Sequence, residues 1–251
     1  MAAVRLKLVV IPVLAACGWL AIQWLDWSRL LSFEVTGRWE EYLLSRRIKL
    51  LLSATVTLLV WTTGRAALSD RDRRLMRGAF GAVVSADIAF FLNNYHIGIG
   101  VFSIAQVLLI IRNASGMMTL ARRGWSAKVA RLLFVAVIVG VVDFLLLKVL
   151  FVPHAANPMF PVIAVYSLLL CCSLWAGIAC AIIGFFPEVN SRLVAVGVGM
   201  LYLGDLTVGL NLILPHDTSY IISTSLTWFF YLPAITLLAL SGYRWNECPV
   251  F

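Results

Sequence analysis

Long apolar stretches, separated by short polar breaks, follow one another along almost the whole chain. A helix needs about 20 predominantly apolar residues to cross the hydrocarbon core of a bilayer. The pattern therefore predicts about eight transmembrane helices, over residues 8–25, 48–67, 78–94, 97–111, 131–152, 160–186, 193–214 and 219–242. The charged run Ser69–Arg74 is expected to be a break between two of them. The expected fold class is all-α: a polytopic membrane helix bundle that forms a single domain over residues 1–251.

The composition supports a membrane protein and excludes several other classes. Of the 251 residues, 62% are hydrophobic and 13% are charged, and the mean hydropathy is +0.95. Soluble domains have about half apolar and a quarter charged residues, so a soluble globule or a disordered chain is excluded. The five cysteines form no CxxC pair and no Cys/His ligand spacing, which argues against a zinc site or a disulfide scaffold. We expect no metal and no cofactor.

The distribution of basic residues predicts the orientation of the chain. The net charge is +8, and an N-terminus inside the cell places most of the Lys and Arg residues in inner loops. The positive-inside rule then favours both termini in the cytoplasm, and we expect a bacterial inner membrane. The basic segment 112–131 lies beside the membrane, so anionic phospholipids are its expected partner rather than nucleic acid. The oligomeric state stays open.

Two N-terminal features leave alternatives open. Leu14–Cys17 is similar to a lipoprotein cleavage site, although the apolar run continues beyond it and favours a first membrane span. The mixed segment 26–47 is expected to be a solvated loop with aromatic anchors, and an amphipathic surface helix is the alternative.

Acidic residues inside the apolar stretches are the strongest functional signal. Of the twelve acidic residues, only Asp87, Asp143 and Asp205 fall inside predicted spans. A carboxylate at this depth costs several kcal/mol unless it is paired, protonated or exposed to a wet cavity. We interpret Asp87 and Asp205 as functional, and we favour a structural hydrogen bond for Asp143.

Other polar residues are placed to share a pocket with these carboxylates. Asn94 follows Asp87 by seven residues and should share its helix face. A stripe in the last span either lines a cavity or joins helices; it consists of Tyr220, Thr224, Thr227 and Tyr231. Together these side chains predict a narrow polar pocket for a lipid-like molecule.

Five segments between residues 50 and 242 resemble, in the same order, motifs of the YhhN or lysoplasmalogenase-like integral membrane proteins. They are Gly81–Phe90 with Asp87, Phe102–Gln106, Pro161–Tyr166, Gly199–Asp205 and Phe230–Ser241. The chain departs from the family pattern at Ala86, where the family has glycine, at Gly204, where it has serine, and at Gln106, where it has histidine.

The resemblance implies cleavage of the vinyl ether bond of a lysoplasmalogen, a lysophospholipid, to a fatty aldehyde and a glycerophospho-alcohol. This chemistry needs proton transfer to carbon, a nearby anion and one water. Our hypothesis is that Asp87 and Asp205 face one cavity and divide the acid and base roles. The residues expected to position water and substrate are Asn94, Gln106, Tyr166, Asn211 and Tyr231.

Three other functions remain open. A transporter or a lipid- or ion-binding protein would use the same aspartates without hydrolysis, and the glycines of residues 193–214 suit the broken helices of a carrier. A metal-dependent lipid hydrolase would use His96, His154 and His216. A scaffold would use the aspartates only to join helices.

Overall fold

The computed structural model of the protein describes residues 2–31, 39–122, 126–214 and 218–245. Within these ranges the fold consists of helices, with one isolated bridge between Ala67 and Tyr243 and no strand. The long helices are α1 (Ala2–Leu31), α2 (Trp39–Trp61), α3 (Asp70–Phe91), α4 (Tyr95–Asn113), α6 (Ala127–Leu146), α7 (Phe160–Ile183), α8 (Glu188–Asn211) and α9 (Thr218–Leu240). A short helix, α5 (Met117–Arg122), connects α4 to the segment before α6. The chain is thus all-helical where it is described, as the apolar pattern predicts.

Six helices of the described chain are long and apolar enough to cross a membrane. They are α1, α4, α6, α7, α8 and α9, with α6 extended by the turns that follow it. The helices α2 and α3 have similar lengths but carry more charged residues. The chain is therefore a multi-pass membrane protein with six candidate spans, and the expected total of eight stays a prediction.

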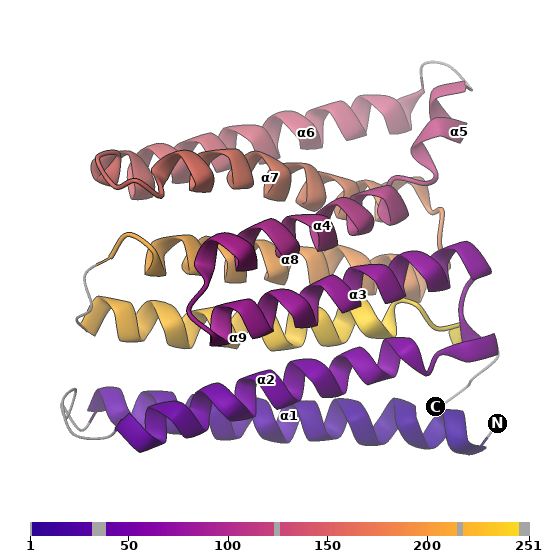
Figure 1. The fold of residues 1–251 in the computed structure, drawn as a ribbon. Coiled ribbons are helices and arrows are strands. Elements are labelled where there is room, and N and C mark those ends of the chain that lie inside the picture. Colours follow the sequence, from indigo (N-terminus) through magenta and orange to yellow (C-terminus); the bar gives the residue numbers. More distant parts are fainter. Residues whose placement is uncertain (1, 32–38, 123–125, 215–217, 246–251) are drawn as a thin grey trace.

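The helices run side by side in one bundle, with α1 and α2 at one edge and α6 and α7 at the other (Figure 1). Between these edges lie α3, α4, α8 and α9, and α9 packs against α8, α1 and α2. The helix α7 contacts α4, α6 and α8, and so connects α6 to the middle of the bundle. α1 begins and α9 ends at the same end of the bundle (Figure 1).

The outward faces of α1 and α6 carry exposed apolar side chains, which include Leu20, Phe134 and Phe144. The inward faces meet in one core that contains Val56, Phe80 and other residues from α1, α2, α3, α4, α7, α8 and α9. An apolar exterior around a packed interior is the arrangement that lipid favours, because hydrocarbon tails are as apolar as the side chains they contact.

The charged run Ser69–Arg74 is not the break that we expected, because α3 already begins at Asp70. The Ser69 hydroxyl accepts a hydrogen bond from the Asp72 amide, which caps the first turn. Acidic residues in a first turn also favour a helix start. The one buried side chain in this run is Asp72, which pairs with Arg112 at 2.6 Å.

The expectation of a solvated loop over 26–47 is also wrong for most of its length. α1 continues to Leu31, and α2 begins at Trp39. Residues 32–38 lie outside the described chain. Asp26 and Lys49 are buried against each other, so this part of the two helices belongs to the packed bundle.

The chain is irregular where α6 ends. A π-helical turn over Leu147–Phe151 and a 3₁₀ turn over Val152–His154 follow directly after α6. Phe151 is buried, and its ring lies so close to Gly209 that a β-carbon there would sit 3.0 Å from it. π-helical turns occur often at functional sites, and Phe151 belongs to the wall of the cavity described below.

Candidate functional site

Asp87 lies on α3 and is held by side chains from two other helices. The hydroxyl of Ser53, on α2, donates to Oδ2 of Asp87. The hydroxyl of Tyr231, on α9, lies 2.9 Å from Oδ2 and 3.0 Å from Oδ1. Together these donors hold the Asp87 side chain at the junction of three helices.

Asp205 lies on α8 and has the same kind of environment. Its Oδ2 accepts a hydrogen bond from Gln106 Nε2 at 2.9 Å and one from the Tyr166 hydroxyl at 3.0 Å. Gln106, on α4, accepts in turn from the Ser173 hydroxyl at 2.7 Å. Side chains of α4 and α7 therefore fix this carboxylate of α8. The side-chain amide of Gln106 donates to Asp205 through its nitrogen and accepts from Ser173 through its oxygen.

Asp143, on α6, completes a set of three carboxylates that each accept from a tyrosine. The Tyr202 hydroxyl donates to Asp143 at 2.8 Å, and Ser167 donates to it at 2.8 Å. The hydrogen bonds join α6 to α7 and α8. We had expected Asp143 to make a structural hydrogen bond of this kind, but its side chain also reaches the cavity wall.

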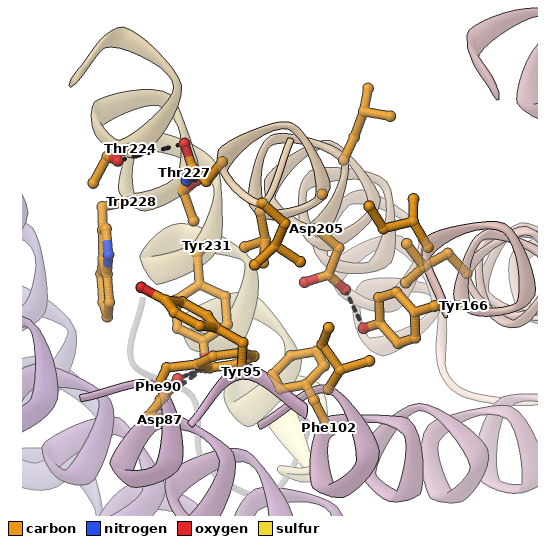
Figure 2. A pocket seen from close by; sticks show the side chains of 18 of the residues that line it. Asp87, Phe90, Tyr95, Phe102, Tyr166, Asp205, Thr224, Thr227, Trp228 and Tyr231 are labelled. Atoms are coloured by element: carbon orange, nitrogen blue, oxygen red, sulfur yellow. Dashed lines mark hydrogen bonds between the residues drawn. The ribbon is translucent and has the colours of Figure 1, made fainter. Parts of the chain in front are cut away.

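All three carboxylates line one cavity of about 190 Å³. Figure 2 shows Asp87 and Asp205 on opposite sides of the hollow, with Tyr231 beside Asp87 and Tyr166 beside Asp205. Much of the remaining wall is apolar, with contributions from Ile99, Phe102, Phe151, Ile163, Leu170 and Leu206. A few polar groups in an apolar hollow are typical of small-molecule sites.

The polar stripe of α9 serves both purposes that we had considered. Tyr220, Thr224, Thr227 and Tyr231 all line the cavity. Thr227 also joins α9 to α8, because its hydroxyl lies 2.9 Å from that of Thr207. The stripe therefore supplies polar groups to the hollow and holds one of its walls in place.

The structure brings most of the expected site residues together. Asp87, Asp205, Tyr166, Asn211 and Tyr231 line the cavity. Gln106 is fully buried behind Asp205 and acts on it directly, without a place in the cavity wall.

Asn94 is the exception. The expectation that it shares a helix face with Asp87 is wrong, because α3 ends at Phe91 and Asn93 adopts a left-handed conformation with φ 59°. Asn94 is exposed and caps α4, where its side chain accepts from the Ile97 amide. It lies in a shallow hollow beside the main cavity.

Several cavity residues were not expected from the sequence. Arg46, Lys49, Tyr202 and Trp228 all line the hollow. The second span was predicted to begin at residue 48, which placed Arg46 in a loop. Arg46 and Lys49 have the i, i+3 spacing that places two side chains on one helix face, and this spacing was the signal that could have identified them.

The histidines form no metal site in the described chain. His96 is exposed in α4, and His154 lies in the turn after α6. His216 lies outside the described residues. Among the residues described, no group of three or more His, Cys, Asp or Glu side chains could hold a metal ion.

Comparison of the chain with protein-family models, with characterised proteins and with solved structures finds no match.

Proposed function

We propose that the protein is a membrane-embedded lipid hydrolase that cleaves the vinyl ether bond of lysoplasmalogens. The observation that carries this proposal is that Asp87 and Asp205, from different helices, face each other across one largely apolar cavity (Figure 2). The order of the sequence motifs that resemble those of the lysoplasmalogenase-like proteins supports the same function. A site of two carboxylates with apolar walls suits a substrate with one hydrocarbon chain and one acid-labile bond.

The chemistry needs two groups with opposite tasks. One carboxylic acid transfers its proton to the alkenyl carbon that is not bonded to oxygen, and an oxocarbenium-like cation forms. The other carboxylate stabilises this cation and removes a proton from the attacking water. The resulting hemiacetal breaks its bond to the glycerol oxygen, which takes up a proton, and releases a fatty aldehyde. Addition of one water thus accounts for both products.

The hydrogen bonds of the site suit this division of labour. Gln106 and Tyr166 both donate to Oδ2 of Asp205, and the second oxygen of Asp205 is directed at the hollow (Figure 2). Preorganised groups of this kind reduce the reorganisation needed in the transition state. Phe102, Ile163 and Leu170 supply an apolar surface for the alkenyl chain.

The test is aldehyde release from a lysoplasmenyl lipid by the purified protein in detergent. Asp87→Asn and Asp205→Asn should each lower turnover by at least about a hundredfold, the lower end of what general acid–base groups contribute. Asp70→Asn is the matched control, because Asp70 is an exposed residue at the start of the same helix as Asp87. The control should keep full turnover.

Folding has to be measured in parallel, by size-exclusion profile and thermal unfolding. Full turnover in both cavity variants, or no aldehyde from well-folded wild-type protein, would remove the hydrolase proposal. A transporter or binding protein would then be the better reading, and uptake into vesicles would be the next measurement.

For orientation, we propose that both termini face the cytoplasm of the cell that makes the protein. The start of α1 and the end of α9 lie on one side of the bundle (Figure 1). On that side α3 and α6 begin and α4 ends, with Arg74, Lys128 and Arg112 near those helix ends. Labelling of cysteines introduced near each terminus, from either side of sealed vesicles, checks this orientation.

A further inference from the structure

The wall of the cavity formed by α2 carries two basic side chains that the proposed chemistry does not use. Arg46 and Lys49 both line the hollow. They are three residues apart on α2, so they lie on the same face of that helix. The rest of the wall consists of apolar, hydroxyl, amide and carboxyl side chains, so a basic pair needs an explanation beyond proton transfer.

Lys49 is fixed in place by α1. Its ammonium group lies 2.6 Å from Oδ2 of Asp26, and both side chains are about nine-tenths buried. The hydroxyl of Ser45 donates to the other oxygen of Asp26 at 2.9 Å. On the cavity side, the Lys49 ammonium lies 5.7 Å from the ring centre of Trp228. The charge is therefore held at the wall of the hollow.

Arg46 is fixed by the end of α3. Its Nη2 donates to the carbonyl oxygens of Phe90, at 3.0 Å, and Phe91, at 2.6 Å, and to Oδ1 of Asn93 at 3.0 Å. These acceptors hold the guanidinium about one helical turn beyond Asp87 along α3. The planar guanidinium presents several donors in a geometry that matches phosphate oxygens.

The spacing fits a glycerophospholipid. Five covalent bonds separate the ether oxygen at one end of glycerol from the phosphorus at the other. The carbonyl groups that hold Arg46 belong to residues three and four positions after Asp87 on α3, a rise of about 4.5–6 Å, and the reach of five bonds is of the same order. A substrate with its vinyl ether between the two aspartates would therefore place its phosphate at Arg46 and Lys49.

We propose that Arg46 and Lys49 bind the phosphate of the substrate head group and so determine which lipids enter the site and in which direction. This inference rests on the proposed function for its choice of lipid. The hydrocarbon chain of the lipid then points away from α2, towards the apolar wall formed by α4 and α7. Neutral alkenyl- or alkylglycerols, which lack the phosphate, are then poor ligands.

The experiment measures binding rather than turnover, so that its outcome does not depend on hydrolysis. Purified protein in detergent is titrated with a labelled 1-O-alkyl lysophosphocholine, whose saturated ether is not cleaved by this chemistry. The competitors are 1-O-alkylglycerol and glycerol 3-phosphate. We expect the lysophospholipid to bind at least about tenfold more tightly than the alkylglycerol, as for one charge-assisted hydrogen bond.

Arg46→Gln should remove most of this preference, and Arg46→Lys should restore part of it. Arg47→Gln is the matched control, because Arg47 is the exposed neighbour on α2 and does not line the cavity. Lys49→Gln leaves Asp26 buried without its cation, so Lys49→Gln with Asp26→Asn is the variant of choice there. It should lower the affinity for the lysophospholipid and leave that for the alkylglycerol unchanged.

Three results would overturn the inference. The first is an equal affinity of the wild-type protein for lysophospholipid and alkylglycerol, and the second is an unchanged preference in the folded Arg46 and Lys49 variants. The third is equal competition by glycerol 3-phosphate, which would mean that a soluble phosphate ester, not a lipid head group, occupies the site. Failure of aldehyde release with this binding preference intact would count against the hydrolase alone.

Discussion

The hydroxyl of Tyr231 bridges both oxygens of the Asp87 carboxylate, at 3.0 Å and 2.9 Å, although the two residues are 144 positions apart in the chain. The contact joins α9 to α3 at the cavity wall. It makes the last long helix part of the candidate active site and not only of its support.

Tyr231→Phe should lower turnover while the protein stays folded. Loss of a hydrogen bond to a buried polar group costs about 1–3 kcal/mol, which corresponds to roughly five- to a hundredfold in rate. Steady-state aldehyde release measures the effect. Tyr243→Phe is the matched control, since its buried hydroxyl donates to the Leu59 carbonyl at 2.6 Å, away from the cavity. Equal losses in kcat for both variants would contradict a special role for Tyr231.

The nature of the side chain at position 106 should matter through its hydrogen bonds. Gln106→Leu removes one of the two donors to Asp205 and leaves the buried Ser173 hydroxyl without its acceptor, so turnover should fall at least about tenfold. Gln106→His can still donate to Asp205 and accept from Ser173, and it should keep most of the wild-type rate. Kinetics of both variants, beside their unfolding temperatures, decide the point. A leucine variant as active as wild type would show that Asp205 does not need this donor.

The buried pair of Arg112 and Asp72 should dominate stability at the end of the bundle where α3 begins. Arg112 Nε lies 2.6 Å from Asp72, and the two side chains are 1% and 5% exposed. Removal of one partner from a buried pair costs about 3–5 kcal/mol, so Asp72→Ala should unfold at a clearly lower temperature.

The control for that variant is Asp70→Ala. Asp70 pairs with Arg73 at 2.9 Å, but its side chain is 82% exposed. An exposed pair contributes about 0–1 kcal/mol, so this variant should unfold almost as wild type does. Similar losses in both variants would show that burial is not what gives the Arg112 pair its weight.

Close packing of α8 on α9 should make Gly204 intolerant of a larger side chain. A β-carbon at Gly204 would lie 3.4 Å from the Tyr231 amide nitrogen and 3.5 Å from the Thr227 carbonyl oxygen. Gly204→Val should therefore separate the helices and cost about 1–3 kcal/mol. At Gly199, on the same helix, no atom lies within 4 Å of an added β-carbon, so Gly199→Val is the control. Thermal unfolding of the two variants should differ clearly, and a tolerated Gly204→Val would disprove the close approach.

The positions of the helices could be predicted because lipid imposes a simple rule. Backbone groups in hydrocarbon must be satisfied within the helix, so an apolar run of sufficient length leaves few alternatives. Because charged residues are rare in the apolar runs, Asp87 and Asp205 could be identified as candidate functional residues. The failure at Asn94 has a local cause: Asn93 turns the chain into a left-handed conformation, and a seven-residue spacing has no meaning once the helix has ended.

The partners of the carboxylates were harder to foresee. Which tyrosine meets which aspartate depends on how helices distant in sequence pack, and the spacing within one helix carries no information on that. Tyr202 lies about one turn before Asp205 on α8, but its hydroxyl donates to Asp143 on α6 and not to Asp205. Arg46 was missed for another reason, since it lies in the polar first half of α2.

The site around the two aspartates is distributed over six helices. Ser53, Asp87, Gln106, Tyr166, Asp205 and Tyr231 come one each from α2, α3, α4, α7, α8 and α9. During biosynthesis the helices enter the membrane from the N-terminus onwards, so a partly inserted chain still lacks Tyr231 and one wall of the cavity. Nascent protein would therefore not hydrolyse the surrounding lipids until α9 has entered the membrane. For the same reason, a chain truncated before α9 should be inactive even if the seven long helices described before it insert correctly.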